Sequence, residues 1–409
     1  MSPRYDVVVP SAGRPALARL LAALGEQWGP APQRVIVVDD RADATSAPLE
    51  LGAAADWLGG RLEVVRGAGR GPAAARNAGW TRCAAPWVAF LDDDVVPGPD
   101  WSARLAEDLD GLAPDVAASQ GRIRVPLPRD RRPTDRERCV AGLERAVWAT
   151  ADIVYRRDAL AAVGGFDERF PRAYREDADL GLRIVGAGHR IVRGARTVVH
   201  PVGPAGPLAS VRLQAGNADD VLMRALHGRG WRERAGASPG RRPRHLATVA
   251  GAAIAVGAAA GGRPRLATAA VLAWAAGSAE LAWARIAPGP RGRREVATML
   301  ATSALIPPAA AFHTLMGLAA LPRKLRAAPR TGPTARRPHA VLLDRDGTLV
   351  VDVPYNGDPA AVEPMPGAVE ALDRLRAAGI CTAVVSNQSG IGRGLLSRDR
   401  LEAVNRRVE

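Results

Sequence analysis

Residues 88–98 read VAFLDDDVVPG, an apolar run that ends in three consecutive carboxylates and a Pro/Gly turn. The run has the length and composition of a buried β-strand. Asp92, Asp93 and Asp94 would repel one another at the end of such a strand, and a bound cation would relieve that repulsion. Two aspartates at i and i+2 can offer oxygens to one Mg²⁺ or Mn²⁺ ion, which binds waters and substrate phosphates at its other positions. We interpret the triplet as half of a metal site; a solvated turn is the alternative.

The segments around this strand predict an α/β fold. Short β-branched runs alternate with Ala- and Leu-rich segments at residues 5–9 (YDVVV), 35–38 (VIVV), 62–65 (LEVV) and 87–91 (WVAFL). Strands that alternate with helices at this spacing favour a parallel sheet flanked by helices. Ligands of such sheets bind beyond the carboxyl ends of the strands, where Asp39, Asp40 and the Asp triplet fall.

The composition excludes some classes of protein. A chain of 409 residues is expected to form two or three folded units. Its formal net charge of +14 would favour a nucleic-acid partner, but aromatic residues make up only 4% of the chain, too few for a stacking platform. We therefore expect no nucleic acid. Three widely spaced cysteines fit a reducing compartment, and we expect a cytoplasmic location.

The middle of the chain is unusually poor in charge. Residues 246–262, 266–279 and 296–321 contain no charged residue, and arginines flank each segment. The last segment is long enough to cross a bilayer, which needs about 20 apolar residues, although Pro307 and Pro308 would kink it. Two interpretations stay open for 246–321: a helical bundle packed on the first domain, or contact with the inner face of the cell membrane.

Five motifs in order resemble the family 2 glycosyltransferases of the GT-A fold, across about residues 5–200. They are VVVPSAGRPALARLLAAL, VIVVDD, GPAAARNAGW, FLDDDVVPGPDW and GGFDERF with YREDADLGLR. The resemblance implies a Rossmann-like domain that binds a nucleotide sugar, with Mg²⁺ or Mn²⁺ held by Asp92 and Asp94. His200 matches a position where some members place a late metal or phosphate ligand.

The same resemblance assigns the remaining polar positions of the motifs. It implies that Asp177 removes the proton of the acceptor hydroxyl, with Glu176 as the second candidate. The residues expected around the nucleotide sugar are Pro10, Arg14, Asp39, Asp40, Arg76, Asn77, Asp93 and Arg183. Two of these assignments have an alternative: Arg183 would stabilise the leaving diphosphate or only pair with a carboxylate, and Asp93 would contact the sugar or point elsewhere.

A second strand ends in aspartates at LLDRDGTLV, residues 342–350. Together with SNQSGIGRG it resembles the histidinol-phosphate and heptose-bisphosphate phosphatases of the haloacid dehalogenase superfamily. The resemblance implies that Asp344 is the nucleophile and Asp346 the acid/base, that both hold Mg²⁺, and that Ser386 and Asn387 bind phosphate. The family's downstream lysine and acidic pair are not found before Glu409, so we expect an incomplete Rossmannoid domain.

These patterns predict four segments: a GT-A domain at 1–210, a helical region at 211–322, a basic linker at 323–338 and a partial phosphatase domain at 339–409. The expected partners are a nucleotide-sugar donor, a glycan or lipid-linked acceptor and a sugar phosphate. Two alternatives remain: a phosphatase whose transferase-like domain only binds, and a membrane-associated scaffold with both domains inactive.

Overall fold

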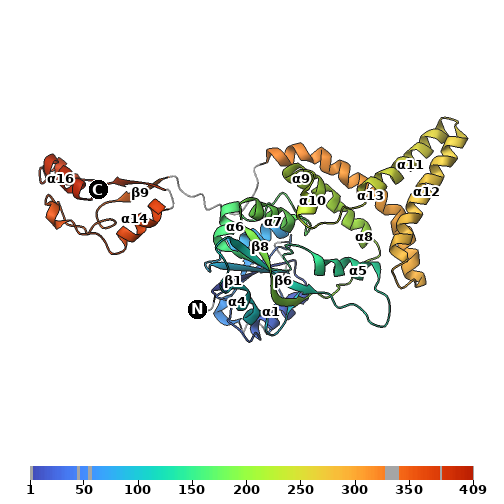
Figure 1. The fold of residues 1–409 in the computed structure, drawn as a ribbon, viewed down its shortest axis with the longest axis horizontal. Coiled ribbons are helices and arrows are strands. Elements are labelled where there is room, and N and C mark those ends of the chain that lie inside the picture. The colour runs from blue at the N-terminus through green and yellow to red at the C-terminus, as the bar shows by residue number, and fades with distance from the viewer. Residues whose placement is uncertain (1–2, 44–46, 54–57, 328–339, 378–379, 409) are drawn as a thin grey trace. The chain divides into compact units, whose positions relative to one another are not determined.

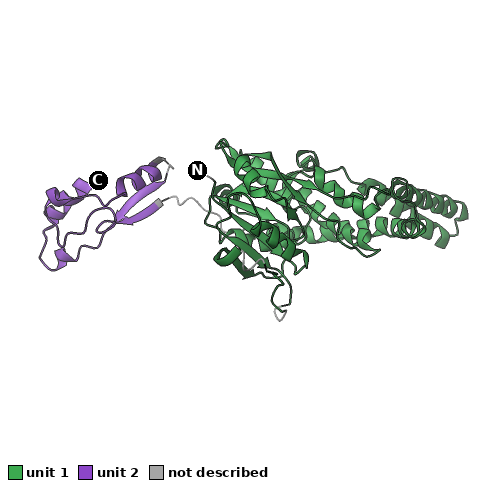
Figure 2. Ribbon diagram, turned by 90° about the horizontal axis from the view of Figure 1, so that it is seen from below, with its two compact units in different colours: residues 1–334 green, residues 335–409 purple. Residues whose placement is uncertain are grey.

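The computed structural model describes residues 3–43, 47–53, 58–327, 340–377 and 380–408. The chain divides into two compact units, Met1–Thr334 and Ala335–Glu409, which Figure 2 draws in different colours. Each unit is described by itself below.

An eight-stranded mixed sheet forms the centre of the first unit, with the strand order β3-β2-β1-β4-β7-β6-β8-β5. The strands are β1 Tyr5–Ser11, β2 Val35–Asp39, β3 Leu62–Arg66, β4 Trp87–Leu91, β5 Val96–Pro97, β6 Val116–Arg124, β7 Asp152–Arg156 and β8 Arg190–Val199. The first four are parallel, as the sequence predicts. Strand β7 runs antiparallel to both β4 and β6, so the sheet as a whole is mixed. The α/β prediction is confirmed.

Helices cover both faces of this sheet, because its central strands are apolar on both sides. Val8, Val38 and Phe90 belong to one core with residues of α3 Pro72–Trp80, α6 Arg157–Val163 and α7 Glu176–Gly186. Val7 and Leu91 belong to the other core, with α1 Ala16–Gly25 and α4 Trp101–Leu109. Alternate residues of one strand point to opposite faces, so each strand contributes to both cores.

The rest of the first unit is helical. Its helices are α5 Asp135–Ala141, α8 Ala209–Arg212, α9 Asn217–His227, α10 Trp231–Arg234, α11 Arg242–Ala260, α12 Pro264–Ile286 and α13 Arg293–Arg326. Helices α11 and α12 form a hairpin that extends away from the sheet (Figure 1). Small residues let the two helices approach closely: a Cβ on Gly277 would lie 2.4 Å from Thr248 Oγ1. Helix α13 continues through Pro307 and Pro308 and packs on α9, where a Cβ on Gly317 would lie 2.7 Å from Ala218 Cα.

Two of the described helices are long and apolar enough to cross a membrane by length and composition alone. They are α12 and α13, with mean hydropathies of 1.3 and 1.5 in their most apolar windows. Only 17% and 28% of those windows are buried, so most of their apolar side chains face outward. Both interpretations of residues 246–321, a helical bundle packed on the first domain and contact with the membrane, stay open.

The second unit is a parallel pair of strands with helices. Strands β9 Ala340–Asp344 and β10 Cys381–Val385 pair in register, so that Asp344 lies opposite Val385. Helices α14 Ala368–Ala377, α15 Ser389–Gly392 and α16 Arg398–Val408 complete the unit. Both strands therefore end at the same edge of the sheet, which brings Asp344 close to the residues that follow β10.

Candidate active site

One cavity of about 930 Å³ opens at the carboxyl ends of β1, β2 and β4. Its walls include four predicted acidic residues, Asp40, Asp92, Asp93 and Asp94. Pro10, Arg14, Arg76 and His200, which were also predicted as site residues, line the same cavity. The topology explains the grouping, because adjacent parallel strands deliver their last residues to one edge of the sheet.

Asp93 and Asp94 of the triplet share Arg14, whereas Asp92 pairs with Arg76. Asp93 is 3% exposed; its Oδ2 accepts a hydrogen bond from Ser11 Oγ at 2.8 Å, and its Oδ1 pairs with Arg14 at 2.8 Å. Arg14 also reaches Asp94 Oδ2 at 2.8 Å. Burial raises the pKa of Asp93, while Ser11 and Arg14 oppose this effect. Asp93 therefore ties the loop after β1 to the loop after β4.

Arg76 connects the triplet with the acidic pair on α7. It is 2% exposed, and its guanidinium donates to Asp92 Oδ1 at 2.8 Å and to Glu176 Oε1 at 2.9 Å. Burial and the neighbouring Asp177 carboxylate raise the pKa of Glu176, and Arg76 opposes both effects. Glu176 Oε2 is buried without a hydrogen-bond partner among the described residues. A buried carboxylate with one oxygen unpartnered and a raised pKa is a candidate functional group.

Asp177 and Glu176 begin α7 just behind the cavity wall. Their neighbours Arg76 and Arg175 line the cavity, whereas the lining does not include the acidic pair itself. Burial also raises the pKa of Asp177, and its Oδ1 accepts a hydrogen bond from the Ala178 amide at 2.7 Å. A carboxylate with a raised pKa is suited to general-base chemistry. The role of Asp177 stays a prediction.

The cavity offers a donor set suited to a divalent cation. His200 Nε2 lies 3.4 Å from Asp94 Oδ1, and Asp92 faces the same space. Two carboxylates with an imidazole fit Mn²⁺ or Mg²⁺, which accept remaining ligands from water and phosphate. Within the described ranges, no three His, Cys, Asp or Glu side chains are already gathered around one point. Water or a substrate phosphate would supply the remaining coordination.

Three predicted nucleotide-binding residues have other partners and do not line the cavity. Asn77 donates to the Phe166 carbonyl at 2.8 Å and accepts from Trp80 Nε1 at 2.9 Å. Arg183 binds Asp179 at 2.8 Å and the Val163 carbonyl at 2.8 Å.

Asp39 is the third of these residues. It is paired with Arg41 and Arg66 at 2.8 and 2.7 Å, and hydrogen bonds from Arg41 lower its pKa to about 2. In this arrangement Asp39 and its two arginines hold the loop after β2, while Asp40 faces the cavity. The roles predicted for Asn77, Arg183 and Asp39 at the nucleotide stay predictions.

The other end of the cavity lies among the helices, and of the arginines that line it only Arg175 belongs to one of the quoted motifs. It is lined by Arg136, Arg175, Arg232, Arg241, Arg242 and His245. Arg175 has a left-handed backbone, with φ of 78°, and its guanidinium lies over the Tyr174 and Trp231 rings at 4.2 and 4.8 Å. A non-glycine residue in this conformation directly before the acidic pair is a local signal of function.

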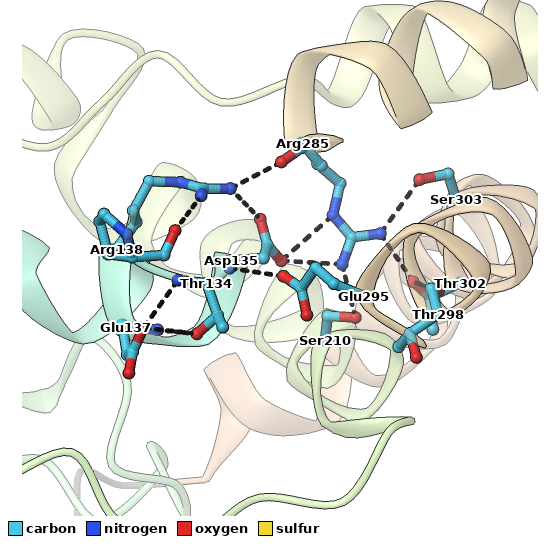
Figure 3. Close-up of polar contacts among 11 residues, drawn as sticks. Thr134, Asp135, Glu137, Arg138, Ser210, Arg285, Glu295, Thr298, Thr302 and Ser303 are labelled. Carbon is cyan, nitrogen blue, oxygen red and sulfur yellow. Dashed lines mark hydrogen bonds and ion pairs between the residues drawn. The ribbon is translucent and has the colours of Figure 1, made fainter. Parts of the chain in front are cut away.

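A polar network fixes the helices beside the cavity. Arg285 on α12 pairs with Asp135 on α5 at 2.8 Å and donates to Thr302, Ser303 and Ser210 on neighbouring elements (Figure 3). The Asp135 amide donates in turn to Glu295 at the start of α13. Helices α5, α12 and α13 are thereby joined at one wall of the cavity.

The second unit places its predicted residues at one edge of its two-stranded sheet. Asp346 Oδ2 accepts hydrogen bonds from Gln388 at 2.7 Å and from Ser386 at 3.3 Å, while Arg345 binds its Oδ1 at 2.9 Å. Desolvation acts to raise the pKa of Asp346, but these hydrogen bonds hold it below its usual range. Asp344 ends β9, and its Oδ1 accepts from the Arg345 amide at 2.8 Å. Asn387 follows Ser386 in the loop after β10.

Known proteins resemble two separate stretches of the chain. A pre-mycofactocin glycosyltransferase from Mycobacterium tuberculosis is 35% identical over 175 residues, which cover 39% of this chain and 35% of that protein. A D-glycero-beta-D-manno-heptose-1,7-bisphosphate 7-phosphatase from Mesorhizobium japonicum is 44% identical over 81 residues, which cover 19% of this chain and 37% of that protein. The chain thus spans about a third of the length of these curated relatives.

Among solved structures, a mannosyltransferase from Pyrobaculum calidifontis in complex with GDP-Man and Mn²⁺ aligns with a TM-score of 0.42 at 21% identity. The alignment covers 80% of this chain and 88% of that chain. The sequence model described as "Glycosyl transferase family 2" matches residues 6–178, which hold the four parallel strands, the Asp triplet and the acidic pair. Residues 6–178 are therefore a glycosyl transferase family 2 domain.

Proposed function

We propose that the first unit transfers a sugar from a nucleotide-diphosphate donor to an acceptor hydroxyl. The observation that carries this proposal is the grouping of Asp40, Asp92 and Asp94 with Arg14 in one cavity at the strand ends. In the reaction, the acceptor oxygen forms a bond to the anomeric carbon while the bond from that carbon to the phosphate oxygen breaks. The nucleoside diphosphate leaves, and the hydroxyl proton passes to a carboxylate, for which we propose Asp177.

A divalent cation at Asp92, Asp94 and His200 would neutralise the charge of the leaving diphosphate. Residues of the chain position the carboxylates, face the nucleoside and balance charge. Arg76 holds Asp92 and Glu176 in place through two hydrogen bonds of 2.8 and 2.9 Å. Asp40, fixed by the Gly71 amide at 2.8 Å, faces the space in which the nucleoside is expected. Arg14 balances the charge of Asp93 and Asp94.

A panel of nucleotide sugars with Mn²⁺ or Mg²⁺ tests the transferase proposal, with release of nucleoside diphosphate as the readout. We expect Asp177→Asn to lower kcat by about 10²–10⁴-fold, the usual range for a catalytic acid or base, and Asp94→Asn to lower turnover because it removes a proposed ligand of the cation. Asp130→Asn, on an exposed loop, serves as the matched control. Undiminished turnover in both site variants would remove the assignment.

We further propose that α11, α12 and α13 contact a membrane, which would place the chain at the inner face of the cell membrane. Leu272, Trp283 and Phe312 are more than half exposed, as are Val256 and Leu315. Arginines stand at both ends of the hairpin, where anionic headgroups would meet them. Helix α11 has 19 residues, a length of about 28 Å at 1.5 Å per residue, close to the hydrocarbon thickness of about 30 Å.

Flotation with vesicles of phosphatidylcholine and phosphatidylglycerol tests this contact. We expect the full chain to float with the vesicles and the variant Val256→Asp/Leu272→Asp to remain at the bottom of the gradient. Leu127→Asp, at an exposed apolar residue in a different part of the unit, should float like the wild type. If the hairpin variant floats equally well, the outward apolar face does not bind lipid.

The second unit supports a second candidate activity, hydrolysis of a sugar phosphate. We propose Asp344 as the nucleophile and Asp346 as the acid/base, with Mg²⁺ at both and phosphate bound by Ser386 and Asn387. The hydrogen bonds that bring Ser386 and Gln388 to Asp346 support this arrangement. Phosphate release from D-glycero-D-manno-heptose 1,7-bisphosphate with Mg²⁺, compared with Asp344→Asn, is the test. Equal release by the two proteins would contradict it.

A further inference from the structure

The two ends of the large cavity differ in charge. The end at the sheet holds Asp40 and the Asp triplet, which suit a cation and a nucleoside. The end among the helices has six arginines and only two acidic residues, Asp135 and Asp220. The six are Arg136, Arg175, Arg232, Arg241, Arg242 and Arg285. A nucleotide sugar held at the sheet end would leave this basic end for another molecule.

Part of this positive charge is already neutralised. Arg175 and Arg232 share Asp220, Arg285 pairs with Asp135, and Arg241 pairs with Glu280. The positive charge of these four arginines is therefore partly balanced by neighbouring carboxylates.

Two further arginines of the basic end remain unpaired. Arg136 and Arg242 form no ion pair with any residue that the structure describes. Burial lowers the pKa of the adjacent His245, and the positive charge of Arg241 lowers it further, as expected in a positive field. The basic end thus carries uncompensated charge that faces a cavity.

The chemistry of this wall indicates which ligand it suits. Arginine presents paired N–H donors that match phosphate oxygens, and charge-assisted hydrogen bonds to phosphate are stronger than neutral ones. Apolar side chains from Val140, Leu143, Leu213 and Ile306 line the same cavity. A ligand that carries a phosphate next to an apolar group would satisfy both features.

We propose that the basic end is the acceptor subsite and that it binds the phosphate group of a phosphate-bearing acceptor through Arg136 and Arg242. This inference rests on the proposed transferase function and names the class of its second substrate. The phosphate could belong to a lipid or to a soluble sugar phosphate. Helix α11 leads from Arg242 directly to the exposed Leu246, Ile254 and Val256, which places an apolar surface where the chain of a lipid phosphate would continue.

Calorimetry with phenyl phosphate on the full chain tests the subsite. EDTA is present, so that no cation can link the phosphate to Asp92 and Asp94. We expect wild type to bind and Arg136→Gln/Arg242→Gln to bind at least tenfold more weakly. Arg19→Gln, on the exposed face of α1, should bind like the wild type. No binding by wild type, or equal binding by the double variant, would overturn the proposal.

Two competition arms identify the source of the phosphate. Displacement of phenyl phosphate by vesicles that contain phosphatidic acid assigns a lipid phosphate, and displacement by glucose 6-phosphate assigns a soluble one. Either result supports the subsite, and failure of both overturns it. A separate titration with nucleoside diphosphates and Mn²⁺ reports on the sheet end. If wild type binds phenyl phosphate but does not bind nucleoside diphosphate with Mn²⁺, the result counts against the transferase proposal and leaves the phosphate site supported.

Discussion

Arg285 on α12 pairs with Asp135 on α5 at 2.8 Å, although 149 residues lie between them in the sequence. The pair is mostly buried, with side-chain exposures of 10% for Arg285 and 25% for Asp135. The Arg285 guanidinium also donates hydrogen bonds to the hydroxyl groups of Thr302, Ser303 and Ser210. The Arg285 guanidinium therefore connects α12 with α5 and α13 at one wall of the cavity (Figure 3).

We predict that Asp135→Asn destabilises the first unit by about 2 kcal/mol, because it leaves the buried Arg285 charge without its carboxylate. The exposure of Asp135 keeps the loss below the range of about 3–5 kcal/mol found for fully buried pairs. Urea unfolding of the full chain measures it. Asp130→Asn, on the exposed loop before α5, should change stability by less than about 0.5 kcal/mol. If Asp135→Asn and Asp130→Asn change the free energy of unfolding equally, the Arg285–Asp135 pair makes no net contribution to stability.

The buried Arg76 leads to a second prediction, based on rescue. Arg76→Gln removes the cation between Asp92 and Glu176 and should cost about 3 kcal/mol, because a buried carboxylate then lacks its partner. The double variant Arg76→Gln/Glu176→Gln should recover much of this stability, because it removes the stranded charge as well. A double-mutant cycle by urea unfolding measures the coupling. Strict additivity of the two substitutions would contradict the assignment of the pair.

A third prediction concerns pH and the start of α5. Hydrogen bonds from Arg131 lower the pKa of Glu137 to about 2 from its ordinary value of 4.5, although burial opposes this, and Thr134 completes a capping box. A carboxyl group with a lowered pKa in the folded state stabilises the fold when it is ionised. The contribution should therefore be complete above about pH 5 and disappear as the pH falls toward 2.

The difference in unfolding free energy between wild type and Glu137→Gln measures this contribution. We expect wild type to be the more stable at pH 7 and the difference to shrink between pH 5 and pH 3. Glu107→Gln, at an exposed residue of α4, is the control, and its difference should vary less. A difference for Glu137→Gln that stays constant with pH would show that the lowered pKa is not realised.

Local patterns predicted the sheet end of the site because its residues follow strands directly. Buried parallel strands are continuous apolar runs, so Asp40 and the Asp triplet could be placed at one edge of the sheet from their positions in the chain. The basic end could not be placed in this way. Arg175 directly precedes α7 and Arg242 lies at the start of α11, and both line the cavity only because these segments, distant in the chain, pack within one unit. Asn77 and Arg183 match family positions in the sequence, but their hydrogen bonds lie inside the fold.

Gly71 leads to the last prediction, because both its backbone and its surroundings exclude a side chain. Its φ is +98°, and a Cβ would lie 2.1 Å from the Pro171 carbonyl oxygen. Gly71 also precedes α3, and its amide holds Asp40 at 2.8 Å. Gly71→Ala should therefore destabilise the unit by about 2–3 kcal/mol, since a left-handed backbone alone costs about 1–3 kcal/mol for a residue with a side chain.

Gly142→Ala is the matched control for this substitution. Gly142 has an ordinary right-handed backbone, and a Cβ there would meet no atom within 4 Å. It should leave stability unchanged or raise it slightly, because alanine reduces the freedom of the unfolded chain. Because the Gly71 amide positions Asp40, Gly71→Ala should also weaken the binding of a nucleoside diphosphate in the presence of Mn²⁺. If Gly71→Ala has the same free energy of unfolding and the same affinity for nucleoside diphosphate as Gly142→Ala, the loop at Gly71 tolerates a side chain. The position of Asp40 would then not depend on the geometry of that loop.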